Sequence, residues 1–254
     1  MDYLKTNAKA WDEHVANGYI WTQPVSPAVI RKAKNGEWSL VLTPQKAVPR
    51  NWFPEDIKGK SILVIAGGGG QQGPVLAAAG ATVTVFDNSK RQLEQDEFVA
   101  KREGLSINTV QGNMQDLSVF AEEHFDFIMQ FAGGFVDCVL PVWKEAYRVL
   151  KKGGTMIAGH NNPFECIFDV EALEARREFV VRHKIPYSDI DSLTSEEFER
   201  VTAGEGVFFG HTLHDLIQGQ MDAGFALTGF YEDHGGSALD EYISTFFATR
   251  AVKL

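Results

Sequence analysis

From Gly59 onward, the sequence alternates short apolar runs with longer amphipathic segments. The apolar runs, which we expect to form strands, are residues 61–66, 82–87, 106–110, 125–131 and 154–158. The segments between them, which we expect to form helices, are residues 71–79, 90–103, a short stretch after Asp116, and 139–150. Strands that alternate with helices in this way form βαβ units, which build a parallel sheet covered on both faces. The alternation therefore predicts a doubly wound α/β fold.

Residues 161–210 interrupt this alternation. They contain an acidic amphipathic stretch at 169–182 that predicts a helix. Segments that follow the carboxyl end of a strand lie above the ligand crevice of an open α/β sheet, so we interpret this one as a lid insertion. After it, residues 214–223 predict a helix, and 225–232 and 242–252 predict two final strands.

The first 58 residues are rich in Trp and Pro and show no long periodicity. Residues 7–15 predict a helix, and Ser26 followed by Pro27 is typical of a second helix start. Large indoles are usually packed, so we expect this segment to form an arm that lies against the rest of the chain. Glycines are expected to end helices in the left-handed conformation at Gly80, Gly104 and the pair Gly153 and Gly154.

Composition limits the partners of the protein. The 254 residues include 24 Lys plus Arg against 34 Asp plus Glu, a formal net charge of −10. Nucleic-acid binding needs a gathered basic surface, so we expect no nucleic-acid partner. No apolar stretch approaches the roughly 18 residues of a membrane span, and none at the N-terminus resembles a signal peptide. With two cysteines, Cys138 and Cys166, that lack CxxC spacing, we expect a cytoplasmic protein without membrane contact.

Four consecutive glycines, Gly67 to Gly70, directly follow the first predicted strand. Gly68, Gly70 and Gly73 fit the pattern G-x-G-x-x-G, which is typical of a turn that brings backbone N–H groups and a helix N-terminus against a ligand. Asp87 ends the next strand, where a carboxylate accepts hydrogen bonds from the two hydroxyls of a ribose. Together these features predict a site for an adenosine cofactor.

At these residues the sequence resembles the class I S-adenosylmethionine-dependent methyltransferases, in particular their small-molecule branch. The resemblance covers roughly Lys58 to Leu254 and rests on the glycine motif at Ile62 to Gly70 and on the turn RVLKKGG that leads into the fifth strand. It implies a Rossmann-like seven-stranded sheet of order 3-2-1-4-5-7-6 with an antiparallel seventh strand. It also implies S-adenosylmethionine as cofactor and a small molecule as methyl acceptor. We therefore expect one methyltransferase domain, residues 1–254, composed of the arm (1–58), a cofactor-binding half (59–160), the lid insertion (161–210) and a C-terminal helix with a hairpin (211–254).

The resemblance also implies which residues hold the cofactor. Asp87 falls on the position of the ribose-binding acid, and Asn113 and Met114 fall on the pair that contacts adenine. Apart from the resemblance, Trp11, Tyr19 and Trp21 of the arm are candidates to close over the cofactor or to cage a cationic or aromatic substrate; the alternative is that they only anchor the arm to the sheet. The complete set of expected cofactor-binding residues is Ala66, Gly67, Gly68, Gly70, Asp87, Asn88, Asn113, Met114, Gln130 and Trp21.

The sequence departs from the family pattern inside the glycine motif. The acid that usually stands near the amino group of the methionine portion is Val64 here, and the first glycine of the motif is Ala66. Asn113 replaces the common Asp at the adenine edge, which is a mild change because its carbonyl still accepts a hydrogen bond. The loss of the first acid means that backbone carbonyls near Ala66, or polar groups of the arm, have to meet the amino group.

The methyl acceptor is expected beside the ends of the fourth and fifth strands. Methyl transfer mainly requires alignment of the nucleophile, and a base is needed only when the nucleophile is protonated or weakly acidic. His160, directly after the fifth strand, is the candidate catalytic base because histidine takes up protons near neutral pH; the alternative is a hydrogen-bonded residue of the rim. His211 and His214 lie three residues apart, but without a third ligand we expect no metal site.

Two other functions compete with methyl transfer. A NAD(P)-dependent oxidoreductase carries a similar glycine pattern, and Tyr147 and Lys151 have the Tyr-x-x-x-Lys spacing of some such enzymes. Alternatively, the absence of an acid at Val64 is compatible with a protein that binds an adenosine cofactor without turnover. Methyl transfer from S-adenosylmethionine to a small molecule is the leading hypothesis.

Overall fold

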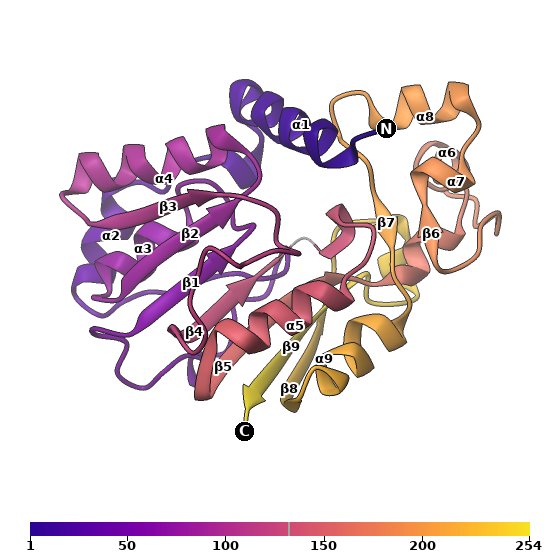
Figure 1. The fold of residues 1–254 in the computed structure, drawn as a ribbon. Helices are drawn as coiled ribbons and strands as arrows, with labels where there is room; N and C mark the ends of the chain where they lie inside the picture. The colour runs from indigo at the N-terminus through magenta and orange to yellow at the C-terminus, as the bar shows by residue number, and fades with distance from the viewer. Residues whose placement is uncertain (132) are drawn as a thin grey trace.

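A seven-stranded sheet forms the centre of the computed structural model, which describes residues 1–131 and 133–254 (Figure 1). Its strands are β1 (Ser61–Ile65), β2 (Thr82–Asp87), β3 (Ile107–Gln111), β4 (Phe125–Gln130), β5 (Leu150–Asn161), β8 (Phe225–Asp233) and β9 (Phe246–Lys253). The strand order is β3-β2-β1-β4-β5-β9-β8, and β9 pairs antiparallel with both β5 and β8. Counted along this sheet alone, the order is 3-2-1-4-5-7-6 with an antiparallel seventh strand, which confirms the predicted topology.

The parallel register brings three strand ends to one edge of the sheet. Val64 of β1 lies opposite Val85 of β2 and Met129 of β4. The residues that follow Ile65, Asp87 and Gln130 therefore emerge side by side at the carboxyl edge, where ligands bind in open α/β sheets.

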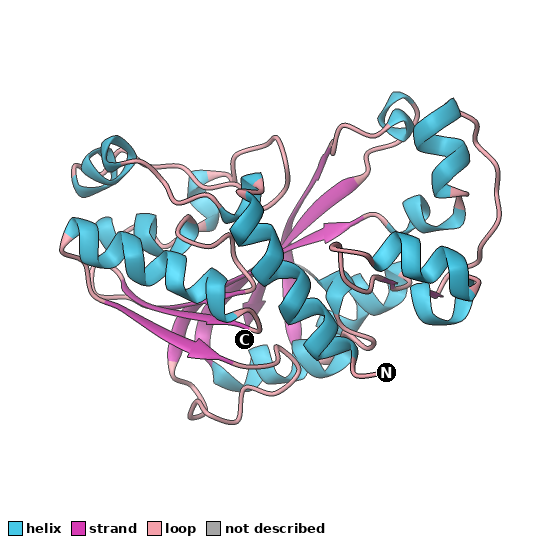
Figure 2. Cartoon of the chain, turned by 90° about the horizontal axis from the view of Figure 1, so that it is seen from above, coloured by secondary structure: helices cyan, strands magenta, loops and turns pink. Residues whose placement is uncertain are grey.

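Both faces of the sheet are covered by helices (Figures 1 and 2). Alternate residues of β1 point to opposite faces: Ile62 and Val64 belong to one apolar core, and Leu63 and Ile65 to the other. The first core includes residues from α2 (Pro27–Lys34), α3 (Gln72–Ala78) and α4 (Lys90–Glu103). The second includes residues from α5 (Leu140–Val149) and from the π-helical turn His214–Gln218, which continues into α9 (Gly219–Asp222).

The N-terminal arm covers the carboxyl edge with its first helix, α1 (Tyr3–Asn17), which lies above the sheet in Figure 1. This helix is longer than the predicted 7–15, because Asp2 accepts a hydrogen bond from the backbone of Lys5 at its start. Short 3-10 turns follow at Ile20–Thr22 and Arg50–Trp52. The rest of the arm packs into the first core through Ile30, Leu40 and Trp52.

Residues 161–210, which we interpret from the sequence as a lid and continue to call the lid, contain short elements that lie beside the end of α1 in Figure 1. They are a 3-10 turn (Pro163–Ile167), α6 (Val170–Arg176), β6 (Tyr187–Ser188), α7 (Asp189–Ser192), α8 (Ser195–Thr202) and β7 (Phe209–Gly210). Two further 3-10 turns, Gly133–Phe135 and Ala238–Glu241, lie outside the insertion. None of the helices in residues 1–131 and 133–254 combines the length and the apolarity needed to span a bilayer.

Three local predictions were wrong. The helix expected over 169–182 ends at Arg176, because Arg177 turns into the left-handed conformation with φ 56° and the chain folds back. The short helix expected after Asp116 is a series of turns. Gly153 has φ 73° but lies within β5 and does not end a helix, since α5 passes directly into that strand at Leu150.

Candidate functional site

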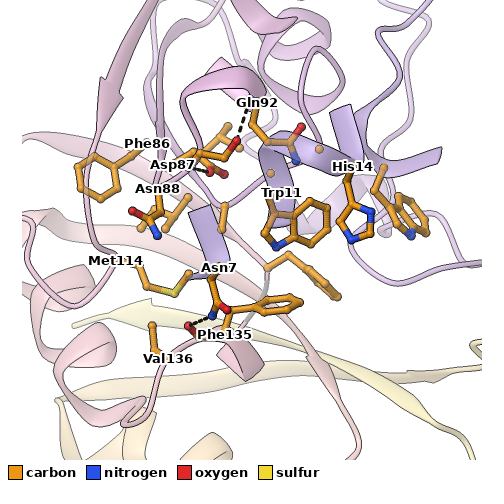
Figure 3. Close-up of a pocket in the computed structure, with 18 of the residues that line it drawn as sticks. Asn7, Trp11, His14, Phe86, Asp87, Asn88, Gln92, Met114, Phe135 and Val136 are labelled. Carbon is orange, nitrogen blue, oxygen red and sulfur yellow. Dashed lines mark hydrogen bonds between the residues drawn. The ribbon is translucent and has the colours of Figure 1, made fainter. Parts of the chain in front are cut away.

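A cavity opens at the carboxyl edge of β1, β2 and β4, under α1 (Figure 3). Asn7, Trp11 and His14 project into it from α1, opposite Asp87 and Met114 of the sheet edge. Eight of the ten predicted cofactor-binding residues line this cavity: Ala66, Gly67, Gly68, Asp87, Asn88, Asn113, Met114 and Trp21. The fold therefore gathers residues from four separate segments of the sequence at one site.

The glycine turn holds its shape through bonds within the protein. The backbone N–H of Gly68 donates to Gln72 Oε1 at 2.8 Å, and that of Gly69 donates to Gln92 Oε1 at 3.1 Å. Two of the N–H groups that the sequence suggested for a ligand are thus already bonded to glutamine side chains. These two hydrogen bonds tie the turn to α3 and α4.

Close packing explains why this turn consists of glycines. A Cβ on Gly67 would lie 2.7 Å from Val64 Cγ1, and a Cβ on Gly68 would lie 2.8 Å from the carbonyl oxygen of Trp21. Ala66, by contrast, adopts φ 49°, a left-handed conformation that usually favours glycine. The arm therefore packs directly on the turn. The missing side chains of the glycines allow this contact and also leave room for a ligand.

Two predicted cofactor residues do not reach the cavity. Gly70 has φ 73° and its carbonyl accepts a hydrogen bond from Val25 N at 3.0 Å, so it anchors the arm. Gln130 is buried at the end of β4, and its Oε1 has no partner among the described residues. The side chain belongs to the opposite face of β4 from Met129, which does line the cavity.

Asp87 lies at the end of β2, where its Oδ1 accepts a hydrogen bond from Ser89 N at 2.7 Å. Burial raises the pKa of Asp87 to about 7; the Ser89 N–H opposes this shift and the Asp12 carboxylate adds to it. Near neutral pH this carboxyl is therefore close to its titration midpoint. Two donating hydroxyls of a ribose would favour the ionised form.

The far end of the cavity is formed by the segment after β3. Asn113 and Met114 line it, and Asn113 Oδ1 accepts a hydrogen bond from Gln115 N at 3.1 Å. A Cβ on Gly112 would lie only 2.3 Å from the Phe86 ring, so this segment passes very close to the end of β2. Both residues predicted to contact adenine are therefore placed at the cavity.

Residues of α1 hold this helix over the cavity, and sequence reasoning did not identify them. Asn7 is 3% exposed and bonds two other segments: its Nδ2 donates to Phe135 O and Val207 O, at 3.2 and 3.1 Å, and its Oδ1 accepts from Val207 N. Asn88 Nδ2 donates to Leu4 O at 2.7 Å. Asn7 meets its partners from distant parts of the chain, so no local sequence signal marked it, whereas Asn88 is expected from the sequence at the cofactor and not as a bond to α1.

A third tie joins α1 to the start of α4. Asp12 Oδ1 accepts hydrogen bonds from Ser89 Oγ at 2.6 Å and from Arg91 N at 3.0 Å. Since Ser89 also donates to Asp87, the docking of α1 is coupled to the residue that the sequence assigns to the ribose.

Aromatic side chains form much of the wall between α1 and the lid. Trp11 contacts Phe135 edge to face, with ring centroids 5.5 Å apart, and Phe135 contacts Phe208 of the lid in the same way at 5.8 Å. Phe131 and Phe246 line the side nearest β5 and β9. This part of the cavity is suited to an apolar or aromatic body.

His160, the predicted catalytic base, lies outside this cavity. It is 3% exposed, stacks on Phe247 with ring centroids 4.7 Å apart, and packs edge to face on Trp143. Its Nε2 lies 3.4 Å from Thr249 Oγ1, and burial lowers its pKa to about 3. His160 is therefore a neutral side chain packed in the core.

The residues that favoured an oxidoreductase are also remote from the site. Tyr147 packs on Phe225 of β8, and Lys151 Nζ lies 3.0 Å from Asp126 Oδ1. Neither residue lines the cavity. The Tyr-x-x-x-Lys spacing therefore reflects packing at the end of α5.

Comparison with known proteins agrees with the family that the sequence resembles. A family model described as a methyltransferase domain matches residues 63–158. The uncharacterized methyltransferase YbaJ of Bacillus subtilis (strain 168) is 54% identical over 250 residues, which span 98% of this chain and 97% of that protein. Among solved structures, an S-adenosylmethionine-dependent methyltransferase from Mesorhizobium loti is similar with a TM-score of 0.61 at 16% identity, over 80% of this chain and 95% of that chain. A SAM-dependent methyltransferase from Methanosarcina mazei has a TM-score of 0.54 at 21% identity, over 80% and 95% of the two chains.

Proposed function

The chain belongs to the S-adenosylmethionine-dependent methyltransferases, and from this premise we propose that the cavity under α1 binds the cofactor and a small, largely apolar methyl acceptor together. The observation that carries the proposal is the arrangement of polar groups at one end of the cavity and aromatic rings beside them. S-adenosylmethionine is the methyl donor of this family, so the new part of the proposal is the chemical class of the methyl acceptor.

The residues of the cavity fit the cofactor in their chemistry. We assign Asp87 to the ribose hydroxyls, Asn113 and Met114 to the adenine, and Gly67 to the methionine portion, since all four line the cavity and Gly67 carries no side chain to obstruct a ligand. When bound, the cofactor supplies an electrophilic methyl group on a sulfonium. The protein has to orient the acceptor and exclude water, and α1 with the lid is placed to do both.

The walls of the cavity support a small acceptor. Trp11 of α1, Phe135 of the segment after β4 and Phe208 of the lid close over the sheet edge from three elements. A macromolecule reaching the methyl group would have to displace these contacts. A surplus of ten negative charges further disfavours a nucleic-acid substrate, and on its two free cysteines we propose that the protein acts in the cytoplasm.

Calorimetry with three ligands tests the proposal. S-adenosylmethionine and S-adenosylhomocysteine are expected to bind with one site per chain, and NAD(H) is not. Tight binding of NAD(H) without either sulfur compound would refute the assignment. Binding of S-adenosylmethionine without methyl transfer to any member of a broad metabolite panel would favour a binding protein without turnover.

Asp87→Ala tests the site itself. Loss of charged hydrogen bonds to the ribose should weaken S-adenosylhomocysteine binding by about 1.5–3 kcal/mol. Asp56→Ala, a change of the same kind at an exposed position of the arm, is the matched control. Unchanged affinity in Asp87→Ala would remove this residue from the site.

A further inference from the structure

The inference below rests on the proposed binding of the cofactor in the cavity and concerns its methionine end. That end carries an ammonium group, which the family meets with an acid at the position of Val64. Val64 lines the cavity as an apolar residue that is 1% exposed. No carboxylate therefore stands at this point of the floor, and the ammonium needs another partner.

The described residues that line the cavity include only two carboxylates, Asp87 and Glu205. Asp87 lies at the end of β2, beside Asn88 and the segment that holds Asn113. Glu205 lies in the lid, after α8, and comes to the cavity from the side of α1. Since the proposed ribose site takes Asp87, Glu205 is the remaining carboxylate for the ammonium.

The backbone around Glu205 is fixed against α1. Gly206 follows with φ 84°, and a Cβ there would lie 2.7 Å from Asn7 Oδ1. Val207 exchanges two hydrogen bonds with the same Asn7 side chain. With the lid packed on α1, Glu205 is therefore held at the wall of the cavity in a defined position.

The side chain of Glu205 is directed by residues at the end of α1. Its Oε2 lies 3.4 Å from His14 Nε2, and the His14 ring stacks on Tyr19 with centroids 4.6 Å apart. The chain then runs from Tyr19 to Trp21, whose carbonyl lies against Gly68. Glu205, His14, Tyr19 and Trp21 all line the cavity, and the Glu205 side chain is 70% exposed, so its carboxylate is accessible to a ligand there.

We propose that Glu205 supplies the carboxylate that binds the ammonium group of the cofactor's methionine portion, in place of the acid that Val64 replaces. His14 acts as a positioning residue that directs this carboxylate. The site is then completed only when the lid lies on α1, so that the sheet edge and the lid each provide one of the two negative charges. An acid at the position of Val64, in β1, would provide its charge whether or not the lid lies on α1.

Calorimetric titration of Glu205→Gln with two ligands tests this proposal. S-adenosylhomocysteine carries the ammonium group, whereas 5′-methylthioadenosine keeps the adenosine and the sulfur but has no amino-acid portion. Glu205→Gln should weaken S-adenosylhomocysteine binding about tenfold, the lower part of the range for a charged hydrogen bond at an exposed side chain. The affinity for 5′-methylthioadenosine should not change. Glu199→Gln removes the same charge from α8 outside the cavity and should leave both affinities at their wild-type values.

The double variant Val64→Asp with Glu205→Gln returns the acid to the family position. Recovery of S-adenosylhomocysteine affinity in this variant, with 5′-methylthioadenosine binding still unchanged, would support the replacement. An equal loss for both ligands in Glu205→Gln, no loss for either, or no recovery in a double variant that folds would overturn it. Failure of the wild-type protein to bind S-adenosylhomocysteine would instead refute the proposed function.

Discussion

Replacement of Asn7 by Ala should loosen the cover of the cavity while leaving the sheet intact. The side chain makes three hydrogen bonds, to Phe135 O, Val207 O and Val207 N, from a buried position. Its removal leaves three backbone groups without their partners, and each buried unsatisfied group costs about 1–3 kcal/mol. Water that enters the vacated space will satisfy some of them, so we expect a total loss of about 2–3 kcal/mol.

This loss acts on the contact between α1 and the lid, because all three bonds join these segments or the turn after β4. At about 1.4 kcal/mol per factor of ten, the ratio of open to closed cover rises roughly 30- to 150-fold. S-adenosylhomocysteine should therefore dissociate faster by a similar factor. Trp11 and Trp21 line the cavity, so tryptophan fluorescence in a stopped-flow displacement experiment reports the rate.

A second variant at the same position and a control variant at the end of α1 complete this test. Asn7→Asp keeps the Oδ1 acceptor but places a carboxylate oxygen where Nδ2 donates to the two carbonyls, so the oxygens repel one another. When the new carboxyl group is ionised, the ligand should dissociate from this variant at least as fast as from Asn7→Ala. Asn17→Ala, at the exposed end of α1, should behave as wild type. A wild-type dissociation rate in Asn7→Ala, together with slow hydrogen exchange at Val207 N–H, would refute the reasoning.

Three further perturbations test the sheet edge. Because the pKa of Asp87 is raised from 3.8 to about 7, its carboxyl is mostly protonated below that pH. The affinity for S-adenosylhomocysteine, measured by calorimetry, should therefore rise with pH towards a plateau above about pH 7. In Asp87→Asn the affinity should not change with pH as pH rises to about 7. The same raised pKa predicts that this group removes stability from the ligand-free protein as pH rises from about 4 to about 7. Ala66→Gly should raise the free energy of unfolding in urea by about 0.5–1 kcal/mol, since φ 49° strains an alanine; a lower midpoint would contradict this. Gly69→Ala should lower the free energy of unfolding by about 1–3 kcal/mol, because the Cβ would lie 2.9 Å from Gln92 O. Gly133→Ala should have little effect, because its Cβ would lie 3.7 Å from Val139 Cγ2, an ordinary contact distance.

The sheet could be predicted because its signals are local. Each strand is an apolar run bounded by polar or glycine residues, and the bounds of β2 and α4 agree with the predictions at 82–87 and 90–103. The errors arose where tertiary contacts decide the local structure. Gly153 has the conformation of a helix end, yet it lies within β5, at the register shift between the pair of Leu150 with Phe125 and the pair of Thr155 with Phe127.

The candidate site divides in the same way. The glycine turn and Asp87 were identified because their spacing follows from the βαβ unit. Asn7 and Glu205 were missed because each is a single polar residue, and the fold brings them together from nearly 200 positions apart in the sequence. The burial of His160 could not be predicted, because its position at a strand end does not reveal which face of the sheet its ring joins.

The arm has a consequence for how ligand binding is coupled to folding. It supplies Trp11 and Trp21 to the cavity, and it also supplies Ile30 and Trp52 to the core under β1. Any ligand held beneath α1 is therefore held by a segment whose remaining residues belong to the main folding unit. Occupancy should shift the thermal unfolding of the entire chain as one transition, and thermal denaturation then becomes a direct screen for the unidentified methyl acceptor.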